Sequence, residues 1–253
     1  MTTLENTFAR KSNAYAQARP RYPRALFDWL VDKCASRRAA WDCATGNGQA
    51  AVDIAPHFAV VQATDLSQEQ VAQGLAVANV VYSAQPAEST HFADNTFDLI
   101  TVAQALHWFD YGKFWPEVAR VGKPGALFCA WGYAWFECDA DISDGLVMPF
   151  RELVAPFWAR NNRILWNGYQ NTDISFPFER LQAPALTIRA HWSVPQLIEY
   201  MQTWSAYKRS RQNTVAAAAL DALLANAREC FARREPLDLS MPLAIVAGFV
   251  SNA

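Results

Sequence analysis

The chain has 253 residues, a net charge of −2 and a sequence pI of about 6.1, with 52% hydrophobic and 18% charged residues. A chain of this size and apolar content can bury a core without disulfides or metals, which excludes a disordered protein. Because basic residues do not outnumber acidic residues, we do not expect a protein that binds nucleic acid through phosphate contacts. The ten tryptophans suggest that some indole rings line a pocket, the alternative being a tryptophan-rich core.

The first half of the chain alternates short apolar runs with helical patterns. Strands are predicted over 39–44, 59–66, 79–85, 97–106 and 126–133, with helices over 45–58, 67–78 and 110–121 between them. Residues 97–106 are apolar almost throughout, which is typical of a parallel strand buried on both faces. The alternation predicts an α/β fold with a doubly wound sheet.

After residue 133 this alternation stops. Aromatic residues and prolines over 134–185 indicate an inserted helical cap. Two further strands are predicted over 186–192 and 241–250, with helices over 194–210 and 214–235 between them. These two strands bring the expected sheet to seven.

Cysteine usage and the N-terminal residues bear on the compartment. The five cysteines are scattered and odd in number, which predicts neither a disulfide framework nor a zinc site. No apolar signal segment and no run of about 18 apolar residues is present. We therefore expect a cytoplasmic protein with no metal, no membrane association and no nucleic-acid partner. Monomer and homodimer both stay open.

A glycine-containing turn follows the first predicted strand, in the sequence DCATGNG that begins at Asp42. Glycines allow a sharp turn and close approach to a ligand, and the next helix offers free N–H groups. Asp65 ends the second strand about 20 residues after Gly46, a spacing typical of an acid that binds a ribose diol. This pattern predicts a site for an adenosine-containing cofactor.

Asp42 narrows the choice of cofactor. Its charge would repel the pyrophosphate of a dinucleotide, whereas a cofactor with a cationic amino-acid end would not be repelled. Asp42 therefore favours S-adenosylmethionine over a nicotinamide dinucleotide. The alternative is that Asp42 only caps the following turn.

Several segments, taken in order, resemble the class I S-adenosylmethionine-dependent methyltransferases, in particular the small-molecule group of trans-aconitate methyltransferase-like proteins. They are YAQARPRYP (15–23), WDCATGNGQAA (41–51), ATDLSQEQ (63–70), AQPAEST (84–90), FDLITVAQALHWFD (97–110), RVGKPGALFCAWGY (120–133) and YMQTWSAYKRS (200–210). Ala44 departs from the family pattern, which usually has glycine there. The resemblance spans nearly the whole chain and implies a Rossmann-like methyltransferase fold, a mostly parallel seven-stranded sheet with a reversed last strand.

On this resemblance we expect a single methyltransferase domain over residues 1–253. It would comprise an N-terminal lid (1–24), a cofactor-binding core (25–133), the inserted cap (134–185) and the C-terminal part of the sheet (186–253).

The resemblance also implies which residues bind the cofactor. The two loop glycines would pass under its methionine part, Asp65 would hold the ribose, and Leu66 would pack on the adenine. The expected set is Tyr15, Arg19, Asp42, Ala44, Gly46, Gly48, Asp65, Leu66, Ala87, Glu88, Gln104 and Ala105. A backbone with negative φ at Ala44 would tolerate the extra methyl group.

Methyl transfer from a sulfonium is an in-line displacement that depends mainly on alignment and exclusion of water. His107 is the candidate base or substrate-orienting residue, the alternative being that it only shapes the pocket; His191 is a second candidate. The expected acceptor-binding residues are Tyr22, Trp108, Trp131, Trp135, Trp158 and Trp166. These rings favour a flat acceptor, whereas the arginines at 151, 160 and 163 would suit an acidic one.

The sequence thus predicts an enzyme that transfers a methyl group from S-adenosylmethionine to a small-molecule acceptor, either aromatic or carboxylate-bearing. One alternative is a nicotinamide-dependent oxidoreductase on a similar sheet. Another is a catalytically silent S-adenosylmethionine-binding protein, which only Ala44 favours. The acceptor and the attacked atom are left open.

Overall fold

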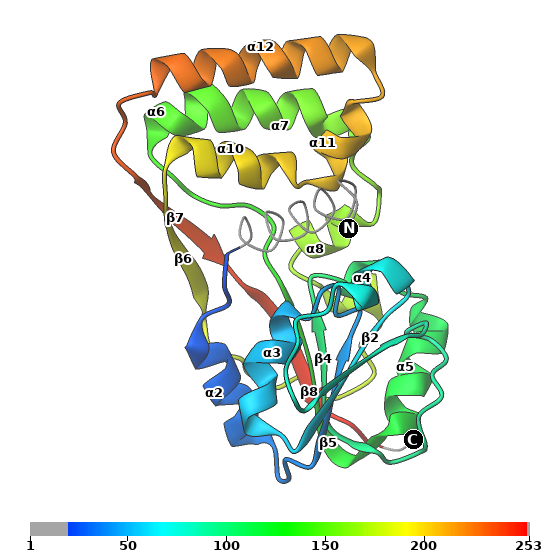
Figure 1. Cartoon of the computed structure of the whole chain (residues 1–253). Helices are drawn as coiled ribbons and strands as arrows, with labels where there is room; N and C mark the ends of the chain where they lie inside the picture. Colours follow the sequence, from blue (N-terminus) through cyan, green and yellow to red (C-terminus); the bar gives the residue numbers. More distant parts are fainter. Residues whose placement is uncertain (1–19, 252–253) are drawn as a thin grey trace, which may run out of the picture. The chain divides into compact units, whose positions relative to one another are not determined.

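The computed structural model describes residues 20–251, and Figure 1 shows their helices and strands. The strands are β1 (Ala39–Cys43), β2 (Val60–Asp65), β3 (Val80–Ala84), β4 (Phe97–Ala103), β5 (Gly122–Gly132), β6 (Thr187–Trp192), β7 (Leu237–Pro242) and β8 (Ala244–Phe249). The helices are α2 (Arg24–Lys33), α3 (Gln49–Ile54), α4 (Gln68–Ala72), α5 (Tyr111–Val121), α6 (Ala140–Ile142), α7 (Met148–Val154), α8 (Asn162–Trp166), α9 (Asn171–Ile174), α10 (Val194–Gln202), α11 (Ser205–Ser210) and α12 (Thr214–Cys230).

These residues divide into two compact units. The sheet unit comprises Arg21–Ala134, Arg163–Leu186 and residues 242–251, and the helical unit comprises Pro20, Trp135–Asn162 and Thr187–Met241. The segment expected to form the cap is therefore split, because its second half belongs to the sheet unit.

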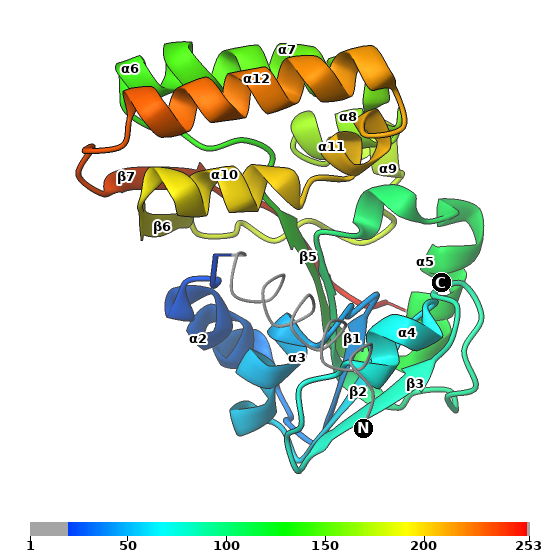
Figure 2. The ribbon, with the colours of Figure 1, turned by 45° about the horizontal axis from the view of Figure 1, so that its top comes forward.

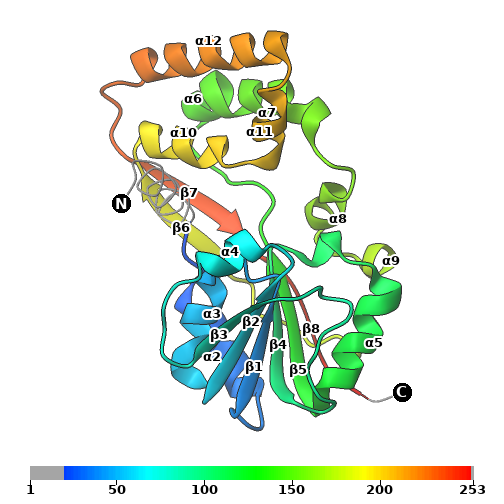
Figure 3. The same cartoon turned by 45° about the vertical axis from the view of Figure 1, so that its right-hand side comes forward.

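The sheet unit contains a six-stranded sheet in the order β3-β2-β1-β4-β5-β8 (Figure 3). Strands β1 to β5 are parallel to their neighbours, and β8 runs antiparallel to β5 with Gly132 opposite Ala244. The doubly wound α/β fold and the reversed last strand are confirmed. The order reverses between β1 and β4, so a ligand crevice is expected at the carboxyl ends of these strands.

The expected count of seven strands is wrong, because β6 does not join this sheet. It pairs with β7 in a separate two-stranded sheet. The physical reason lies in its side chains: Ile188 is buried, but Arg189 and His191 are exposed. An interior parallel strand is buried on both faces, as β4 is, and cannot present an arginine and a histidine to water.

Helices cover both faces of the six-stranded sheet. Leu26 and Leu30 of α2 and Ile54 of α3 pack on one face. Phe114 and Val118 of α5 pack on the other face, together with aromatic residues from the 163–186 segment. This double cover explains why β1 and β4 consist of almost continuously buried residues.

The helical unit contains α7, α10 and α12 together with the β6–β7 sheet (Figure 2). Helix α12 begins at Thr214, because the Asn213 side chain accepts a hydrogen bond from the Ala216 N–H at 3.0 Å, and it ends at Cys230, before the predicted end at residue 235. Within residues 20–251, no helix has the length and apolar character needed to cross a membrane.

Candidate active site

The loop between β1 and α3 has the backbone conformation that its glycines predict. Gly46 and Gly48 have φ values of +60° and +89°. A Cβ atom at Gly48 would lie 2.0 Å from the Tyr82 hydroxyl, so a larger residue would require the Tyr82 ring to move and would also be strained by the positive φ. A Cβ atom at Gly46 would approach only Gln70, at 3.8 Å. Gly46 therefore leaves open space beside the loop for a ligand.

Ala44 adopts a φ of +54°, whereas alanine would be tolerated at this position only if φ were negative. An L-residue in the left-handed region costs roughly 1–2 kcal/mol, because Cβ crowds the following carbonyl oxygen. The alanine that replaces the family's glycine is therefore strained.

Replacing Ala44 with glycine should raise the free energy of unfolding by about 1 kcal/mol, because the backbone strain disappears. Urea unfolding measures the change. The same substitution at Ala63, which is buried in β2, serves as a control and should lower stability. If Ala44→Gly also lowered stability, the strain would not exist.

Asp42 is completely buried at the end of β1. The hydroxyl groups of Thr45 and Thr101 donate hydrogen bonds to its two oxygens, at 2.5 and 2.9 Å. Burial raises the pKa of Asp42 to about 6, although both hydroxyl contacts oppose the shift. The carboxylate is thus held in an environment that favours a nearby positive charge.

Asp65 joins the end of β2 to the glycine loop. Its Oδ2 accepts the Gly46 N–H and its Oδ1 accepts the Ser67 N–H, both at 2.9 Å. A carboxylate has about four lone-pair sites, so each oxygen keeps one acceptor site beyond these contacts. Two adjacent acceptor sites match a ribose diol, and the donor set therefore fits an adenosine-containing cofactor.

The residues expected beside the adenine lie in two segments, one directly after β2 and one after β3. Leu66, directly after Asp65, is 79% exposed, which leaves an apolar surface for a ring. Ala87 is buried in the segment after β3, and the Glu88 carboxylate accepts the Asp110 N–H at 3.1 Å.

The chain after β4 places His107 beside Tyr169, a residue that is distant in sequence and was not predicted to belong to the site. The His107 Nδ1 lies 3.3 Å from the hydroxyl oxygen of Tyr169, and both side chains are buried. Burial lowers the pKa of His107 to about 4, so the imidazole is neutral at physiological pH. Gln104 precedes it with a φ of +59° and donates to the Tyr133 carbonyl at 3.1 Å.

A glycine at position 132 leaves room for the side chains of this cluster. A Cβ atom there would lie 2.9 Å from the Gln104 Oε1 and 3.1 Å from the Tyr169 hydroxyl. The ends of β4 and β5 therefore bring Gln104, His107 and Tyr169 together. Ala105, between them in sequence, is buried.

The predicted acceptor-binding residues do not share one environment. Trp108 and Trp166 are 47% and 37% exposed in the sheet unit. Trp131 is fully buried, with Tyr22 packed against it at a ring distance of 5.5 Å. Its Nε1 has no hydrogen-bond partner within the described part of the chain.

Trp135 and Trp158 belong instead to the helical unit. Their rings pack against each other at 6.0 Å, and each packs against Trp204 at 5.8 Å. The Arg151 guanidinium lies 3.7 Å from the Trp135 ring centroid. His191, the second candidate base, is also in this unit and pairs with Asp238 at 2.9 Å.

Two predicted residues, Tyr15 and Arg19, lie outside the described residues. Three residues that sequence reasoning missed contact the site: Tyr169 at His107, Thr101 at Asp42, and Tyr82 beside Gly48. Tyr82 and Tyr169 lie outside the segments that resemble the family, whereas Thr101 lies in the 97–110 segment, and each reaches the site from another element.

A doubly wound sheet with a glycine turn and an acid at the end of its second strand is typical of proteins that bind an adenosine-containing cofactor. A family model described as a methyltransferase domain matches residues 41–130. A solved structure from Anaeromyxobacter dehalogenans, provisionally named a Type II methyltransferase, is 36% identical with a TM-score of 0.82. That match covers 93% of this chain and 99% of the other. The chain belongs to the class I S-adenosylmethionine-dependent methyltransferases, which sets aside the nicotinamide-dependent alternative.

Two curated relatives agree with this family. A provisionally named methyltransferase from Dictyostelium discoideum is 28% identical over 210 residues, covering 81% of this chain and 79% of the relative. An uncharacterized methyltransferase from Mycobacterium tuberculosis is 34% identical over 130 residues, and the match spans 51% of each chain.

Proposed function

We propose that the protein binds S-adenosylmethionine at the carboxyl ends of β1, β2 and β4 and transfers the methyl group to a small-molecule acceptor. The observation that carries this proposal is the contact between Gly46 and Asp65, which joins the glycine loop to a carboxylate with two remaining acceptor sites. Buried Asp42 supports a cationic cofactor, because its carboxylate is contacted by neutral hydroxyl groups within residues 20–251 and would gain from a positive charge.

When bound, S-adenosylmethionine supplies an electrophilic methyl group. The chain would hold the ribose through Asp65, face the adenine with Leu66, and place the Gln104–His107 segment at the end of β4. Neutral His107 can accept or donate one hydrogen bond, and its contact with Tyr169 fixes the orientation of the ring. A ring with a pKa near 4 is a weak base, so it orients the acceptor rather than holding a proton at neutral pH.

The acceptor class is the finer part of this proposal. Trp108 lies beside His107 at a ring distance of 4.9 Å and is half-exposed, which supports an acceptor with a flat apolar surface. A carboxylate-bearing acceptor, as in the trans-aconitate methyltransferase-like group, stays a prediction.

Calorimetry with S-adenosylhomocysteine tests the proposed function. We expect saturable binding of S-adenosylhomocysteine and no binding of NADH. A panel of heteroaromatic and carboxylate acceptors, incubated with methyl-labelled S-adenosylmethionine, then identifies the acceptor class. NADH binding without S-adenosylhomocysteine binding would contradict the proposal.

Replacing His107 with alanine should lower kcat about ten-fold and leave S-adenosylhomocysteine affinity within about two-fold of wild type. The reason is that His107 orients the acceptor and not the cofactor. Steady-state kinetics with the acceptor found in the panel measures the first effect, and calorimetry measures the second. Tyr169→Phe should show a smaller loss, because it removes only the contact that orients the ring. Intact turnover in His107→Ala would reduce His107 to a pocket wall.

A further inference from the structure

The segment between β3 and β4 contains no helix or strand, yet it is not a loose surface loop. Gln85, Ala87 and Thr90 are all buried. Buried backbone outside regular structure needs specific hydrogen-bond partners. Most of these partners come from one helix, α5.

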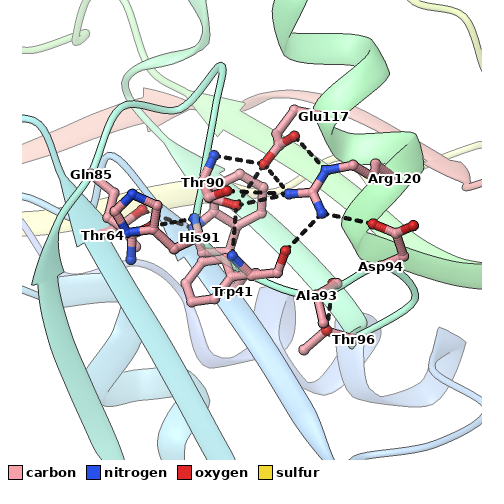
Figure 4. A network of polar contacts seen from close by, with 11 residues as sticks. Trp41, Thr64, Gln85, Thr90, His91, Ala93, Asp94, Thr96, Glu117 and Arg120 are labelled. Atoms are coloured by element: carbon pink, nitrogen blue, oxygen red, sulfur yellow. Dashed lines mark hydrogen bonds and ion pairs between the residues drawn. The ribbon is translucent and has the colours of Figure 1, made fainter.

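We call Thr90, Glu117 and Arg120 the α5 clamp (Figure 4). The Thr90 N–H and hydroxyl both donate to the Glu117 Oε1, at 2.7 and 2.6 Å. Arg120 donates to both oxygens of Glu117, at 2.7 and 2.9 Å. The same guanidinium donates to the Phe92 carbonyl at 2.7 Å and to Asp94 at 2.8 Å. One buried carboxylate and one arginine therefore fix residues 90–94 to α5.

The ionised state of Glu117 keeps the clamp closed. Burial alone would raise its pKa, but hydrogen bonds from Arg120 and Thr90 outweigh this effect and hold the pKa below its ordinary value. Glu117 is thus ionised at neutral pH, and charge-assisted hydrogen bonds are stronger than neutral ones.

The other end of the segment is fixed to the ribose acid. The Gln85 N–H donates to the Asp65 carbonyl at 3.0 Å, and the Gln85 Oε1 accepts the His91 N–H at 2.9 Å. Glu88 makes a further contact with the N–H of Asp110, the residue before α5. Ala87 and Glu88 therefore lie between two anchors, one on β2 and one on α5.

We propose that the α5 clamp is a positioning device that holds Ala87 and Glu88 ready for the adenine edge of the cofactor, beside the ribose acid Asp65. This inference rests on the proposed function, since it assigns Thr90, Glu117 and Arg120 to cofactor recognition. Without the clamp, the segment has to become ordered when the cofactor binds. Part of the binding free energy is then spent on that ordering.

Asp98 provides a matched control for the clamp. It is also a buried carboxylate, and it accepts the N–H groups of Arg38 and Ala39 at 2.8 and 3.0 Å and pairs with Lys123 at 2.5 Å. Asp98 lies at the amino ends of β1 and β4, the end opposite to the glycine loop. Loss of this contact should cost stability without touching the adenine segment.

The test compares Glu117→Gln and Thr90→Val with Thr90→Ser and Asp98→Asn. Calorimetry measures S-adenosylhomocysteine affinity, and hydrogen–deuterium exchange follows residues 85–96 in the free protein. We expect Glu117→Gln and Thr90→Val to weaken binding about ten-fold and to speed exchange in this segment. Thr90→Ser, which keeps the hydroxyl group, and Asp98→Asn should bind within about two-fold of wild type.

The contrary results are distinct. If Glu117→Gln lowered the melting temperature as Asp98→Asn does but bound S-adenosylhomocysteine like wild type, the clamp would only stabilise the fold and the proposal would fall. If wild type bound no S-adenosylhomocysteine, the proposed function would fall, and the adenine role of the clamp with it.

Discussion

Replacing Asp65 with alanine is expected to weaken S-adenosylhomocysteine binding about a hundred-fold or more, because two hydrogen bonds from ribose hydroxyls to a charged acceptor are lost. A hydrogen bond to a charged group contributes about 1.5–3 kcal/mol, and two of them account for this loss. The substitution also releases the N–H groups of Gly46 and Ser67, which lie at the surface of the site. Calorimetry measures the affinity, and circular dichroism establishes that the chain is folded.

Two variants sharpen this measurement. Asp65→Asn keeps the shape and one acceptor oxygen, so its affinity should fall between those of wild type and Asp65→Ala. Asp32→Ala removes an equal charge from an exposed acid that pairs with Lys33 on α2, and it should bind normally. Unchanged affinity in Asp65→Ala would refute the ribose assignment.

Replacing Asp42 with asparagine should stabilise the free protein at pH 8 by up to about 3 kcal/mol. The pKa of Asp42 rises from an ordinary 3.8 to about 6, so the folded state holds this proton more tightly than the unfolded chain. The cost of ionising Asp42 is absent below pH 3.8, grows as the pH rises to about 6, and stays constant above that. Asparagine can keep the contacts with Thr45 and Thr101, because hydroxyl groups donate and accept.

Urea unfolding of both proteins at several pH values measures this difference. We expect the stability advantage of Asp42→Asn to be small near pH 4 and to grow until about pH 6. An advantage that is independent of pH would contradict the burial cost of Asp42. In the proposed function, the positive charge of bound S-adenosylmethionine offsets the cost of burying the ionised Asp42 carboxylate. S-adenosylmethionine should therefore bind wild type more tightly as the pH rises through about 6, and its binding to Asp42→Asn should depend little on pH.

The parts of the fold that the sequence predicts are those determined by local pattern. Continuous apolar runs at β1 and β4, with helices between strands, identify interior parallel strands because both faces are covered. The β6 sequence shows why the strand count was wrong. Its alternation of Ile188 with Arg189 and His191 indicates a strand with one exposed face, but no local pattern tells which sheet it joins.

The contacts of the candidate site also fall into those that local sequence predicts and those that it does not. The contact between Gly46 and Asp65 follows from a spacing along the chain, whereas Tyr169 meets His107 only because residues 163–186 return to the sheet unit. The positive φ at Ala44 also has no signal in its own residue type, since alanine rarely adopts it. Long-range contacts and local backbone strain are therefore the parts of the site that could not be predicted from the sequence.

The pairing of β5 with β8 determines when the sheet can be completed. Gly132 lies opposite Ala244, yet Trp135–Asn162 and Thr187–Met241 of the helical unit are encoded between these two residues. Loop-closure entropy grows only slowly with loop length, so the native sheet tolerates this insertion at little cost. The insertion has a larger consequence during synthesis of the chain. While the chain is being made, β5 keeps an unpaired edge until β8 emerges, and open edges of apolar strands are where nascent chains aggregate.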